Sequence, residues 1–329
     1  MTAVRSGPAE LLDQLARGRR GSLVHVRQVP PRDGQTADWP GWVPEVLRFE
    51  LALRGIDLPW RHQVEAANAI RAGEHVVIAT GTGSGKSLAY QLPVLTHLLD
   101  HPRTTALYLS PTKALAADQL RSVTDLRLPT VRPSGYDGDT PAEEREWIRT
   151  HARLIFTNPD MLHRSILPRH SQWHAFLRRL SFVVIDECHT YRGVFGSHVA
   201  QVIRRLRRVL DRYARRPPVF VLASATAAEP AIAANRLTGL PVRAVTEDTS
   251  PRGGVTFGLW EPPLLRRAAL GAAGAAGTSG PVGANAAVAA TGAPATPDGD
   301  PIRRSVLMET ADLLVDAVTS GRRTLAFVR

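Results

Sequence analysis

A short glycine-rich segment, residues 80–87 with the sequence TGTGSGKS, follows an apolar stretch and precedes a helix-forming one. Glycines let backbone N–H groups curl around phosphate oxygens without a Cβ in the way, and the following helix directs its positive end at the same phosphates. In such loops a lysine neutralises the β- and γ-phosphates and the adjacent hydroxyl ligates Mg²⁺. The strict pattern has glycine at position 80, where this chain has Thr80. We predict an ATP-phosphate site with Ser87 as a metal ligand, formed by Thr80, Gly81, Thr82, Gly83, Ser84, Gly85, Lys86 and Ser87.

Two acidic residues, Asp186 and Glu187, come directly after the apolar run 182–185, FVVI. A phosphate loop needs a carboxylate that positions the metal, at the end of a neighbouring parallel strand. We predict that Asp186 holds Mg²⁺ through water and that Glu187 orients or deprotonates the attacking water. Lys86, Asp186 and Glu187 are therefore the candidate catalytic residues. Without the phosphate loop, the two acids would also fit an ordinary solvated strand end.

The same acids belong to residues 186–189, DECH, which resemble the DEAD/DEAH box of superfamily 2 helicases with cysteine at the variable third position. Residues 224–226, SAT, follow an apolar stretch and resemble helicase motif III. In the family, that motif couples the nucleotide state to movement of the two lobes. By this resemblance, His189 reaches toward Ser224 and Thr226, and these three residues are the candidate coupling residues.

Gln63, within residues 58–63, LPWRHQ, lies upstream of the phosphate loop and resembles the adenine-reading glutamine of the helicase Q-motif. A side-chain amide can pair with N6 and N7 of adenine together, which would favour ATP over GTP. A glutamine on a helix is otherwise an ordinary surface residue, so the order and spacing of the motifs carry this prediction.

Two further segments resemble helicase motifs Ia and Ib: residues 110–115, SPTKAL, and residues 157–162, TNPDML. Each lies where an apolar strand ends, which is the edge at which open α/β sheets bind ligands. In the family these motifs grip the phosphate backbone of one nucleic-acid strand, a contact that hydroxyls, a lysine and backbone N–H groups can make. The alternative for each is a strand–helix turn with a capping residue. The resemblance implies nucleic-acid contacts by Pro111, Thr112, Lys113, Thr157 and Asn158.

Two stretches narrow the resemblance within superfamily 2: residues 135–141, GYDGDTP, and residues 189–198, HTYRGVFGSH. They are similar to the bacterial mitomycin-repair (MrfA-like) branch, whose members are DNA helicases that translocate 3′ to 5′ and act in DNA repair. The resemblance covers roughly residues 20–265 and the last two dozen residues.

Short apolar stretches alternate with helix-forming ones from residue 43 to residue 223. This alternation implies βαβ units and a doubly wound parallel sheet, and an unbroken apolar run is typical of a strand covered on both faces. We predict an α/β fold with helices on both faces of the sheet, which the resemblance makes RecA-like. The expected helices are 43–56, 61–72, 87–99, 114–121, 198–215 and 306–318, and the expected strands are 75–79, 105–109, 130–133, 153–156, 182–185, 219–223 and 323–328.

Composition and resemblance also divide the chain. Residues 1–42 are an N-terminal extension, and residues 43–265 are the ATP-binding lobe. Residues 266–302 are rich in Ala, Gly and Pro and are expected to be a disordered linker, because they cannot bury enough apolar surface to fold. Residues 303–329 resemble the start of a second RecA-like lobe, at which the chain would be truncated. In the family that lobe supplies an arginine finger, so we expect the chain by itself to hydrolyse ATP poorly and not to unwind.

The charge balance indicates a polyanionic partner. The net charge is +11, although a high arginine content can equally reflect a GC-rich genome. Only two of the 41 basic residues are lysines, and both lie in candidate phosphate-contact motifs. The single cysteine excludes an internal disulfide and a cysteine-built zinc site. Because no signal peptide and no apolar run of membrane-spanning length is evident, we expect a cytoplasmic protein without membrane contact.

These observations predict an ATP-dependent DNA helicase of the DEAD/DEAH-box type. ATP and Mg²⁺ would be its cofactors, and its partners would be DNA with a single-stranded segment and a second-lobe polypeptide. Two alternatives stay open. One is a catalytically deficient fragment that binds nucleotide and nucleic acid, and the other is an RNA helicase, because motifs I to III do not distinguish RNA from DNA.

Overall fold

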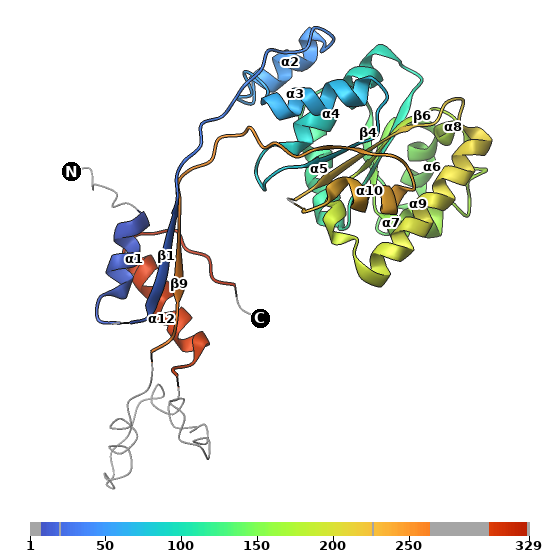
Figure 1. Cartoon of the computed structure of the whole chain (residues 1–329). Coiled ribbons are helices and arrows are strands. Elements are labelled where there is room, and N and C mark those ends of the chain that lie inside the picture. The colour runs from blue at the N-terminus through green and yellow to red at the C-terminus, as the bar shows by residue number, and fades with distance from the viewer. Residues whose placement is uncertain (1–7, 20, 226, 264–302, 328–329) are drawn as a thin grey trace. The chain divides into compact units, whose positions relative to one another are not determined.

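The computed structural model describes residues 8–19, 21–225, 227–263 and 303–327 (Figure 1). The described residues form two compact units, one of residues 33–252 and one that combines residues before 33 with residues after 252. These units do not coincide with the division at residues 43 and 265 expected from composition, which stays a prediction. The expected linker, residues 266–302, lies outside the described residues. No helix in the described part of the chain is long and apolar enough to cross a membrane.

The larger unit is built on a seven-stranded, wholly parallel sheet, which confirms the predicted doubly wound α/β fold. Its strand order is β4–β5–β3–β6–β7–β2–β8. Parallel neighbours need a crossover between them, and helices supply most of these crossovers. The strands are β2 (Val76–Ala79), β3 (Thr105–Leu109), β4 (Pro133–Gly135), β5 (Leu154–Thr157), β6 (Leu180–Ile185), β7 (Val219–Ser224) and β8 (Arg243–Val245).

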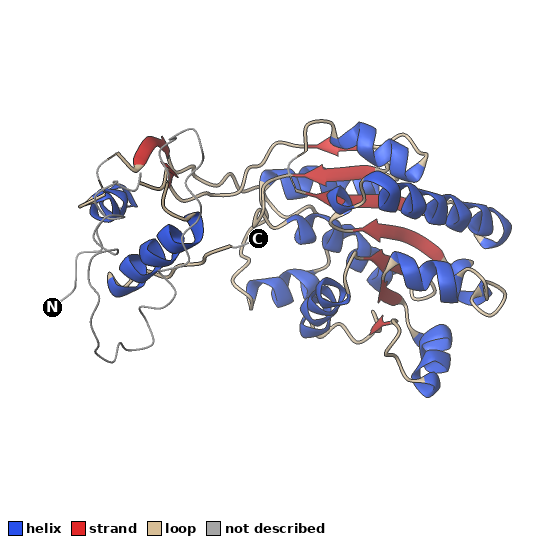
Figure 2. Cartoon of the chain, turned by 90° about the horizontal axis from the view of Figure 1, so that it is seen from below, coloured by secondary structure: helices blue, strands red, loops and turns tan. Residues whose placement is uncertain are grey.

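Helices cover both faces of this sheet, as Figure 2 shows. Alternate residues of a strand point to opposite faces. On β2, Val76 and Ile78 therefore join one core and Val77 the other. The first core is closed by α2 (Glu45–Ala52), α3 (Arg61–Arg71), α4 (Lys86–Asp100) and α5 (Lys113–Asp125). The second is closed by α6 (Ala142–His151), the π-helix η1 (Leu162–Ile166) after α7 (Pro159–Met161), α8 (His174–Leu177), α9 (Gly193–Tyr213) and α10 (Pro230–Thr238).

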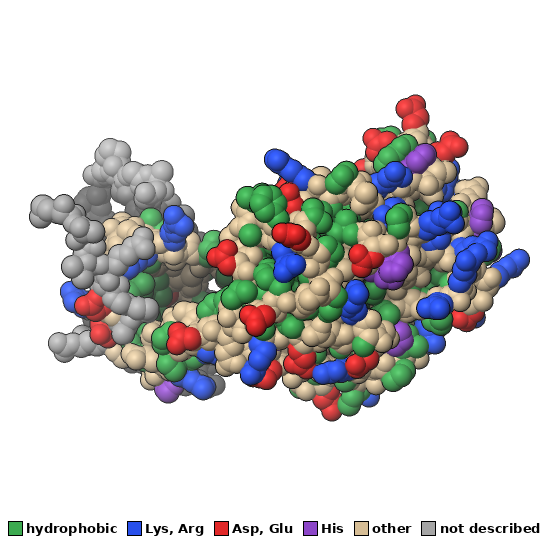
Figure 3. All heavy atoms as spheres, turned by 90° about the horizontal axis from the view of Figure 1, so that it is seen from above, with side chains coloured by type: hydrophobic (Ala, Val, Ile, Leu, Met, Phe, Trp, Pro, Cys, Tyr) green, Lys and Arg blue, Asp and Glu red, His purple; other side chains and the backbone are tan. Residues whose placement is uncertain are grey.

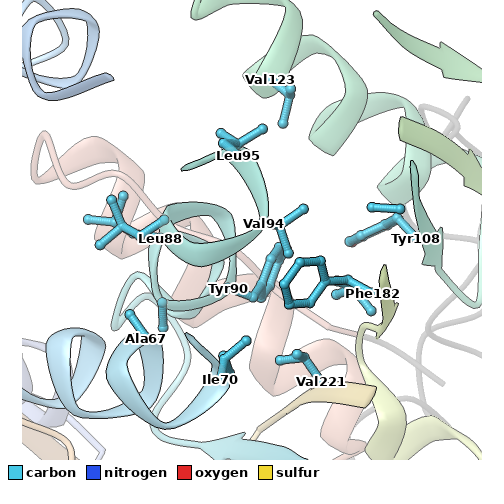
Figure 4. Packing of buried hydrophobic residues seen from close by; sticks show 14 of the residues in the cluster. Ala67, Ile70, Leu88, Tyr90, Val94, Leu95, Tyr108, Val123, Phe182 and Val221 are labelled. Atoms are coloured by element: carbon cyan, nitrogen blue, oxygen red, sulfur yellow. The ribbon is translucent and has the colours of Figure 1, made fainter. Parts of the chain in front are cut away.

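Helix α4 is anchored along its length in the first core. Tyr90 and Val94 of this helix face Phe182 of β6, and Ile70 of α3 packs nearby (Figure 4). Leu95 is only 1% exposed, and burying a side chain of this size contributes about 1.5–3 kcal/mol. The apolar face of α4 thus fixes the position of its first turn, which begins at the residue after the phosphate loop's last glycine.

The smaller unit pairs two segments that are distant in the chain. Trp260 donates a hydrogen bond through Nε1 to Oε1 of the buried Glu309 at 3.0 Å, and Arg304 lies 2.9 Å from the other oxygen of that carboxylate. The paired charge and hydrogen bonds stabilise the burial of this carboxylate. The elements are helix α1 (Pro8–Ala16), helix α12 (Val306–Thr319) and the antiparallel strands β1 (Leu23–Val29) and β9 (Val255–Trp260).

Two predicted strands differ from the structure. The strand expected at 130–133 is displaced to β4, because Arg132 adopts a left-handed φ of 47° that extended backbone does not tolerate. The prediction of a strand at 323–328 is wrong for its first five residues, because residues 323–327 have no regular secondary structure. A strand needs a neighbour for its N–H and C=O groups, and no strand pairs with residues 323–327 in the described part of the chain. Val328 lies outside it.

Candidate functional site

The predicted site residues gather at one edge of the larger unit's sheet, where its strands end. The loop 80–87 follows β2, Asp186 follows β6, and Ser224 is the last residue of β7, the strand between them. Residues 110–113 follow β3, Thr157 is the last residue of β5, and Asn158 comes directly after it. Because all seven strands are parallel, these segments share the carboxyl edge of the sheet. Open α/β sheets bind their ligands at this edge.

The backbone of the loop 80–87 has the curl that a phosphate-binding loop needs. Gly83 and Gly85 adopt left-handed φ values of 79° and 77°, which glycine accepts at little cost. Lys86 begins α4, and its ammonium donates hydrogen bonds to the carbonyls of Gly81 at 2.9 Å and Thr80 at 3.3 Å. The lysine side chain therefore lies over the loop from which it projects.

The remaining loop side chains divide into buried and accessible groups. The hydroxyls of Thr80 and Ser84 are buried and lie 2.7 Å apart, so they tie the two ends of the curl together. Thr82 is exposed at the tip, and Ser87 is half-buried in the first turn of α4. Of the hydroxyls, Thr82 and Ser87 are thus the accessible ones.

Gln63 is buried against the loop, with 2% of its surface exposed. Its Nε2 donates to the Gly85 carbonyl at 2.8 Å, while its Oε1 accepts the Trp60 backbone N–H at 2.8 Å. The alternative that Gln63 is an ordinary surface residue is therefore wrong. Its amide links the start of α3 to the last glycine of the loop.

The contact between Gln63 and Gly85 leads to a first prediction. A Cβ on Gly85 would lie 2.5 Å from Gln63 Nε2, whereas one on Gly83 would meet nothing within 4 Å. Both glycines have positive φ, so both alanine variants carry the same kind of backbone strain. We expect Gly85→Ala to be destabilised by about 1–2 kcal/mol more than Gly83→Ala in urea unfolding. Adding Gln63→Ala to each variant should remove most of this difference, because the side chain that the new Cβ would displace is then absent. A difference that persists would show that the contact with the Gln63 amide is not its cause.

Two tyrosines hold the carboxylate of Asp186. Tyr108 of β3 donates a short hydrogen bond to Asp186 Oδ2, and Tyr90 of α4 donates to the same oxygen at 3.4 Å. Burial and the Asp186 charge raise the pKa of both hydroxyls, so both remain protonated donors at neutral pH. Tyr90 lies in the same helix, α4, as Ser87, so the helix that begins at the phosphate loop also reaches the carboxylate of Asp186.

Glu187 and His189 lie beside the end of β7. Glu187 has a left-handed φ of 47°, a strained conformation that is often found at functional sites. Nδ1 of His189 lies 3.2 Å from the Ala225 backbone nitrogen and 3.1 Å from Glu187 Oε2. The same nitrogen cannot accept from the amide and donate to the carboxylate at once, so His189 makes one of these two contacts at a time. Ser224 donates to the Ala225 carbonyl at 2.8 Å, and Thr226 lies outside the described residues.

The two segments predicted to contact nucleic acid are capped helix starts. Thr112 caps α5 by accepting from the Leu115 N–H at 3.3 Å, and Asn158 caps α7 by accepting from the Met161 N–H at 2.8 Å. The Thr157 hydroxyl is buried and donates to the Tyr136 carbonyl at 2.6 Å. Both a capping role and a phosphate contact fit these positions, because a helix N-terminus presents free N–H groups.

Lys113 and Pro111 stand at the same place. Lys113 is half-exposed, and its ammonium lies 2.6 Å from Oδ2 of the exposed Asp139. An exposed pair of this kind is weak and exchanges readily with another anion. Pro111 is only partly exposed, directly after β3.

Three residues of the site were not predicted from the sequence. Asp248, in the loop after β8, accepts the backbone N–H of Gly81 through Oδ2 at 3.2 Å. The three-residue strand β8 that brings it there has too short an apolar pattern to be predicted. Tyr90 and Tyr108 were likewise missed as partners of Asp186, because an aromatic residue in an apolar stretch is indistinguishable from a core residue in sequence.

A pocket of 580 Å³ adjoins the phosphate loop. Trp60, Gln63, Gly85 and Ser87 line one side, and residues 54–58 line another. This volume falls within the range of about 300–1,000 Å³ that is common for small-molecule sites. The arrangement therefore combines a pocket for a flat, partly apolar group with a curl of N–H groups for phosphates.

Comparison with known proteins identifies the family. The family model described as DEAD/DEAH box helicase matches residues 60–233, which is more than half of the chain. The chain belongs to the DEAD/DEAH box helicase family. The matched region contains the loop 80–87, the DECH segment 186–189 and the SAT segment 224–226.

The proteins and solved structures that are similar to this chain are also helicases. The uncharacterized ATP-dependent helicase YprA of Bacillus subtilis is 42% identical over 75% of this chain and 33% of its own length. The ATP-dependent helicase HRQ1 of Saccharomyces cerevisiae is 38% identical over 93% of this chain and 26% of its own. Crystal structures of the DUF1998 helicase MrfA, bound to DNA or to DNA and AMPPNP, each match at 35% identity with a TM-score of 0.80. These matches cover 95% of this chain and 40% and 39% of MrfA. The fold is therefore RecA-like, and the chain spans about a quarter to two fifths of these relatives.

Proposed function

We propose that this chain is the ATP-binding lobe of an ATP-dependent DNA helicase, which couples ATP hydrolysis to translocation along a single strand and to unwinding. The observation that carries the proposal is the hydroxyl of Tyr90, three residues after Ser87 in α4, which donates a hydrogen bond to Asp186 of the DECH segment. This contact places a phosphate-binding curl and a carboxylate side by side. Such a pair is the minimum that ATP with a divalent cation requires.

The oxygen ligands fit Mg²⁺. Mg²⁺ binds oxygen, retains several waters, and takes its other ligands from one or two protein groups and the substrate phosphates. Ser87 and Asp186 supply a hydroxyl and a carboxylate at the carboxyl edge of the sheet, so we propose them as the protein groups that hold the ion. When bound, Mg²⁺ neutralises charge that develops on the phosphates.

The neighbouring groups divide the remaining tasks. We propose that the N–H groups of residues 81–87 and the ammonium of Lys86 bind the phosphates, with Lys86 exchanging its carbonyl partners for phosphate oxygens. Glu187 orients or deprotonates the attacking water. His189 can contact either Glu187 or the backbone N–H of Ala225, and by exchanging one for the other it couples the nucleotide state to the end of β7. The coupling roles proposed for Ser224 and Thr226 depend on this connection.

For adenine we propose the 580 Å³ pocket beside Trp60. Gln63 lines this pocket, but both functional atoms of its amide already have partners within the chain. A pairing of Gln63 with N6 and N7 of adenine therefore requires the amide to exchange these bonds. The alternative is that Gln63 contributes indirectly by holding Gly85 in place.

For nucleic acid we propose the edge formed by Pro111, Thr112, Lys113, Thr157 and Asn158. The structures of MrfA bound to DNA favour DNA over RNA as the partner. A role in DNA repair rests on the likeness of residues 135–141 and 189–198 to the MrfA-like branch. Unwinding further needs the arginine finger of a second RecA-like lobe, which is the partner that we propose for this edge of the sheet.

Steady-state ATP turnover with Mg²⁺ tests this proposal. We expect slow turnover that single-stranded DNA increases more than single-stranded RNA of the same length. Glu187→Gln is expected to abolish turnover while ATP binding remains, because only the activation of water is lost. Equal stimulation by RNA would favour the RNA-helicase alternative. Turnover no higher than that of Glu187→Gln with either nucleic acid would favour a catalytically deficient fragment.

A further inference from the structure

We propose that the opposite edge of the sheet carries a second nucleic-acid site, which binds the phosphodiester backbone of a single strand. The site is an 800 Å³ pocket that we call the arginine pocket. It lies at the amino ends of the strands and contains none of the residues assigned above to ATP or to nucleic acid. Its charged side chains are those of Arg71, Arg103, Arg178, Arg179, Arg215 and Arg216, and three histidines, His97, His101 and His174, lie among them.

The strand topology explains why these residues meet. Arg103 precedes β3, Arg178 and Arg179 precede β6, and Arg215 and Arg216 precede β7. Because β3, β6 and β7 are parallel neighbours, the segments that lead into them converge at one edge. This is the edge away from the phosphate loop.

The arginine pocket is far more basic than the composition of the chain explains. Basic residues make up 41 of the 329 residues, or about one in eight, whereas six of the eighteen lining residues are arginine. Among the described residues, no aspartate or glutamate lines it, although the chain has 30 acidic residues. A general arginine bias would raise the number of arginines everywhere without removing the acids. The local excess therefore points to an anionic ligand.

The six arginines have no acidic partner among the described residues that would give them a structural role. Within the described ranges, none of the six forms an ion pair. Arg71 instead lies over the ring of Trp42, 4.9 Å from its centroid. Burial and the neighbouring His101 lower the pKa of His97 to about 4, and the charge of Asp100, which raises the pKa, offsets this only in part. The positive charge at neutral pH therefore comes from the arginines, which stay charged at any physiological pH.

A second, smaller pocket extends this surface. It shares Arg103 and Arg179 with the arginine pocket and adds Arg132 and Arg149, again without an acidic lining residue. A single phosphate could not engage guanidinium groups spread over both pockets. A linear polyanion could, because its charges repeat along a chain. In Figure 3, basic side chains (blue) and histidines (purple) gather toward the right-hand end of the larger unit.

The lining also indicates the form of the polyanion. Phe182, the one aromatic residue in it apart from the histidines, is buried, so no aromatic platform is available for stacking bases. Contacts would then be made to phosphates, which position a nucleic acid without reading its sequence. A flexible single strand can follow a concave pocket. A DNA duplex has a persistence length of about 150 base pairs, so it is too stiff to bend into the pocket and would contact only its rim.

The test removes four exposed arginines of the pocket. We expect Arg178→Gln/Arg179→Gln/Arg215→Gln/Arg216→Gln to bind fluorescent oligo(dT) at least tenfold more weakly in an anisotropy titration. The slope of log K against log salt should fall by about 2–3, since each lost phosphate contact on a single strand is worth about 0.7. A matched control loses four exposed arginines that lie outside both pockets, and should stay within twofold of the unmodified chain: Arg121→Gln/Arg127→Gln/Arg208→Gln/Arg236→Gln.

Three results would overturn the second site. The first is an equal loss of oligo(dT) affinity in the pocket variant and the control. The second is that the unmodified chain shows no salt-sensitive binding of oligo(dT). The third is that inorganic polyphosphate displaces oligo(dT) as effectively, per phosphate, as unlabelled oligo(dT) does. The last would show a general polyanion site. Nucleotide binding should be unchanged in the pocket variant. The proposal for the arginine pocket and the proposal for the ATP site can therefore fail independently, because oligo(dT) binding tests the first and nucleotide binding tests the second.

Discussion

Replacing Lys86 with alanine is expected to lower the affinity of this chain for ATP–Mg²⁺ at least tenfold, or by about 1.4 kcal/mol or more. The ammonium lies over the loop on two carbonyls, from which it can turn to phosphate oxygens. Alanine leaves no cation at the centre of the N–H curl. Lys86→Arg should fail as well, because a planar guanidinium does not fit where a compact ammonium sits between phosphates. Calorimetric titration with AMPPNP measures both variants.

Lys113, the only other lysine of the chain, supplies a crossed comparison. Lys113→Ala should leave the affinity for AMPPNP unchanged and weaken the binding of single-stranded DNA. Lys86→Ala should weaken AMPPNP binding and leave the binding of single-stranded DNA, measured without nucleotide, unchanged. If both alanine variants lowered nucleotide affinity equally, the assignment of Lys86 to the phosphates would be wrong.

Replacing Arg153 with methionine is expected to destabilise the larger unit by about 3 kcal/mol. Arg153 is 7% exposed, and its guanidinium donates to the carbonyls of Leu98 at 2.8 Å, His101 at 2.6 Å, Thr130 at 2.7 Å and Thr104 at 3.1 Å. Methionine has a similar length and no donor, so these carbonyls would lose a partner that they share. Burial lowers the pKa of Arg153, but the group remains charged at neutral pH.

The position of Arg153 gives this effect a second cause. Leu98 lies in the last turn of α4, where carbonyls have no partner within the helix and where a positive charge is favourable. Urea unfolding followed by circular dichroism measures the change. Arg121→Met, at a side chain that is 75% exposed, is the control and should change the free energy of unfolding by less than about 0.5 kcal/mol. Equal effects of the two substitutions would contradict the capping role of Arg153.

The parts of this site that could be predicted from sequence are those whose geometry is local. A glycine-rich curl between a strand and a helix is set by residues 80–87 themselves, and an acid after an apolar strand lies at the carboxyl edge of any parallel sheet. Asp186 and Lys86 could therefore be placed together before the fold was known. The parallel sheet followed from the same alternation of strands and helices, except for β8, which no expected strand covers.

The parts that could not be predicted depend on distant packing. Asp248 reaches Gly81 only through β8, a strand of three residues at the edge of the sheet. The pairing of β1 with β9 joins segments more than two hundred residues apart, and neither has a clear alternation of buried and exposed positions. The burial of Gln63 likewise depends on where the Gly85 carbonyl lies.

ATP is proposed to bind with its phosphates on the loop 80–87, beside Asp186. Hydrogen–deuterium exchange with and without AMPPNP and Mg²⁺ tests this placement, because a bound phosphate protects the N–H groups that it accepts from. We expect slower exchange in peptides that cover residues 80–87 and 186–189, and no change at these residues in Lys86→Ala. Saturable AMPPNP binding with unchanged exchange at residues 80–87 would place the nucleotide elsewhere and contradict the account.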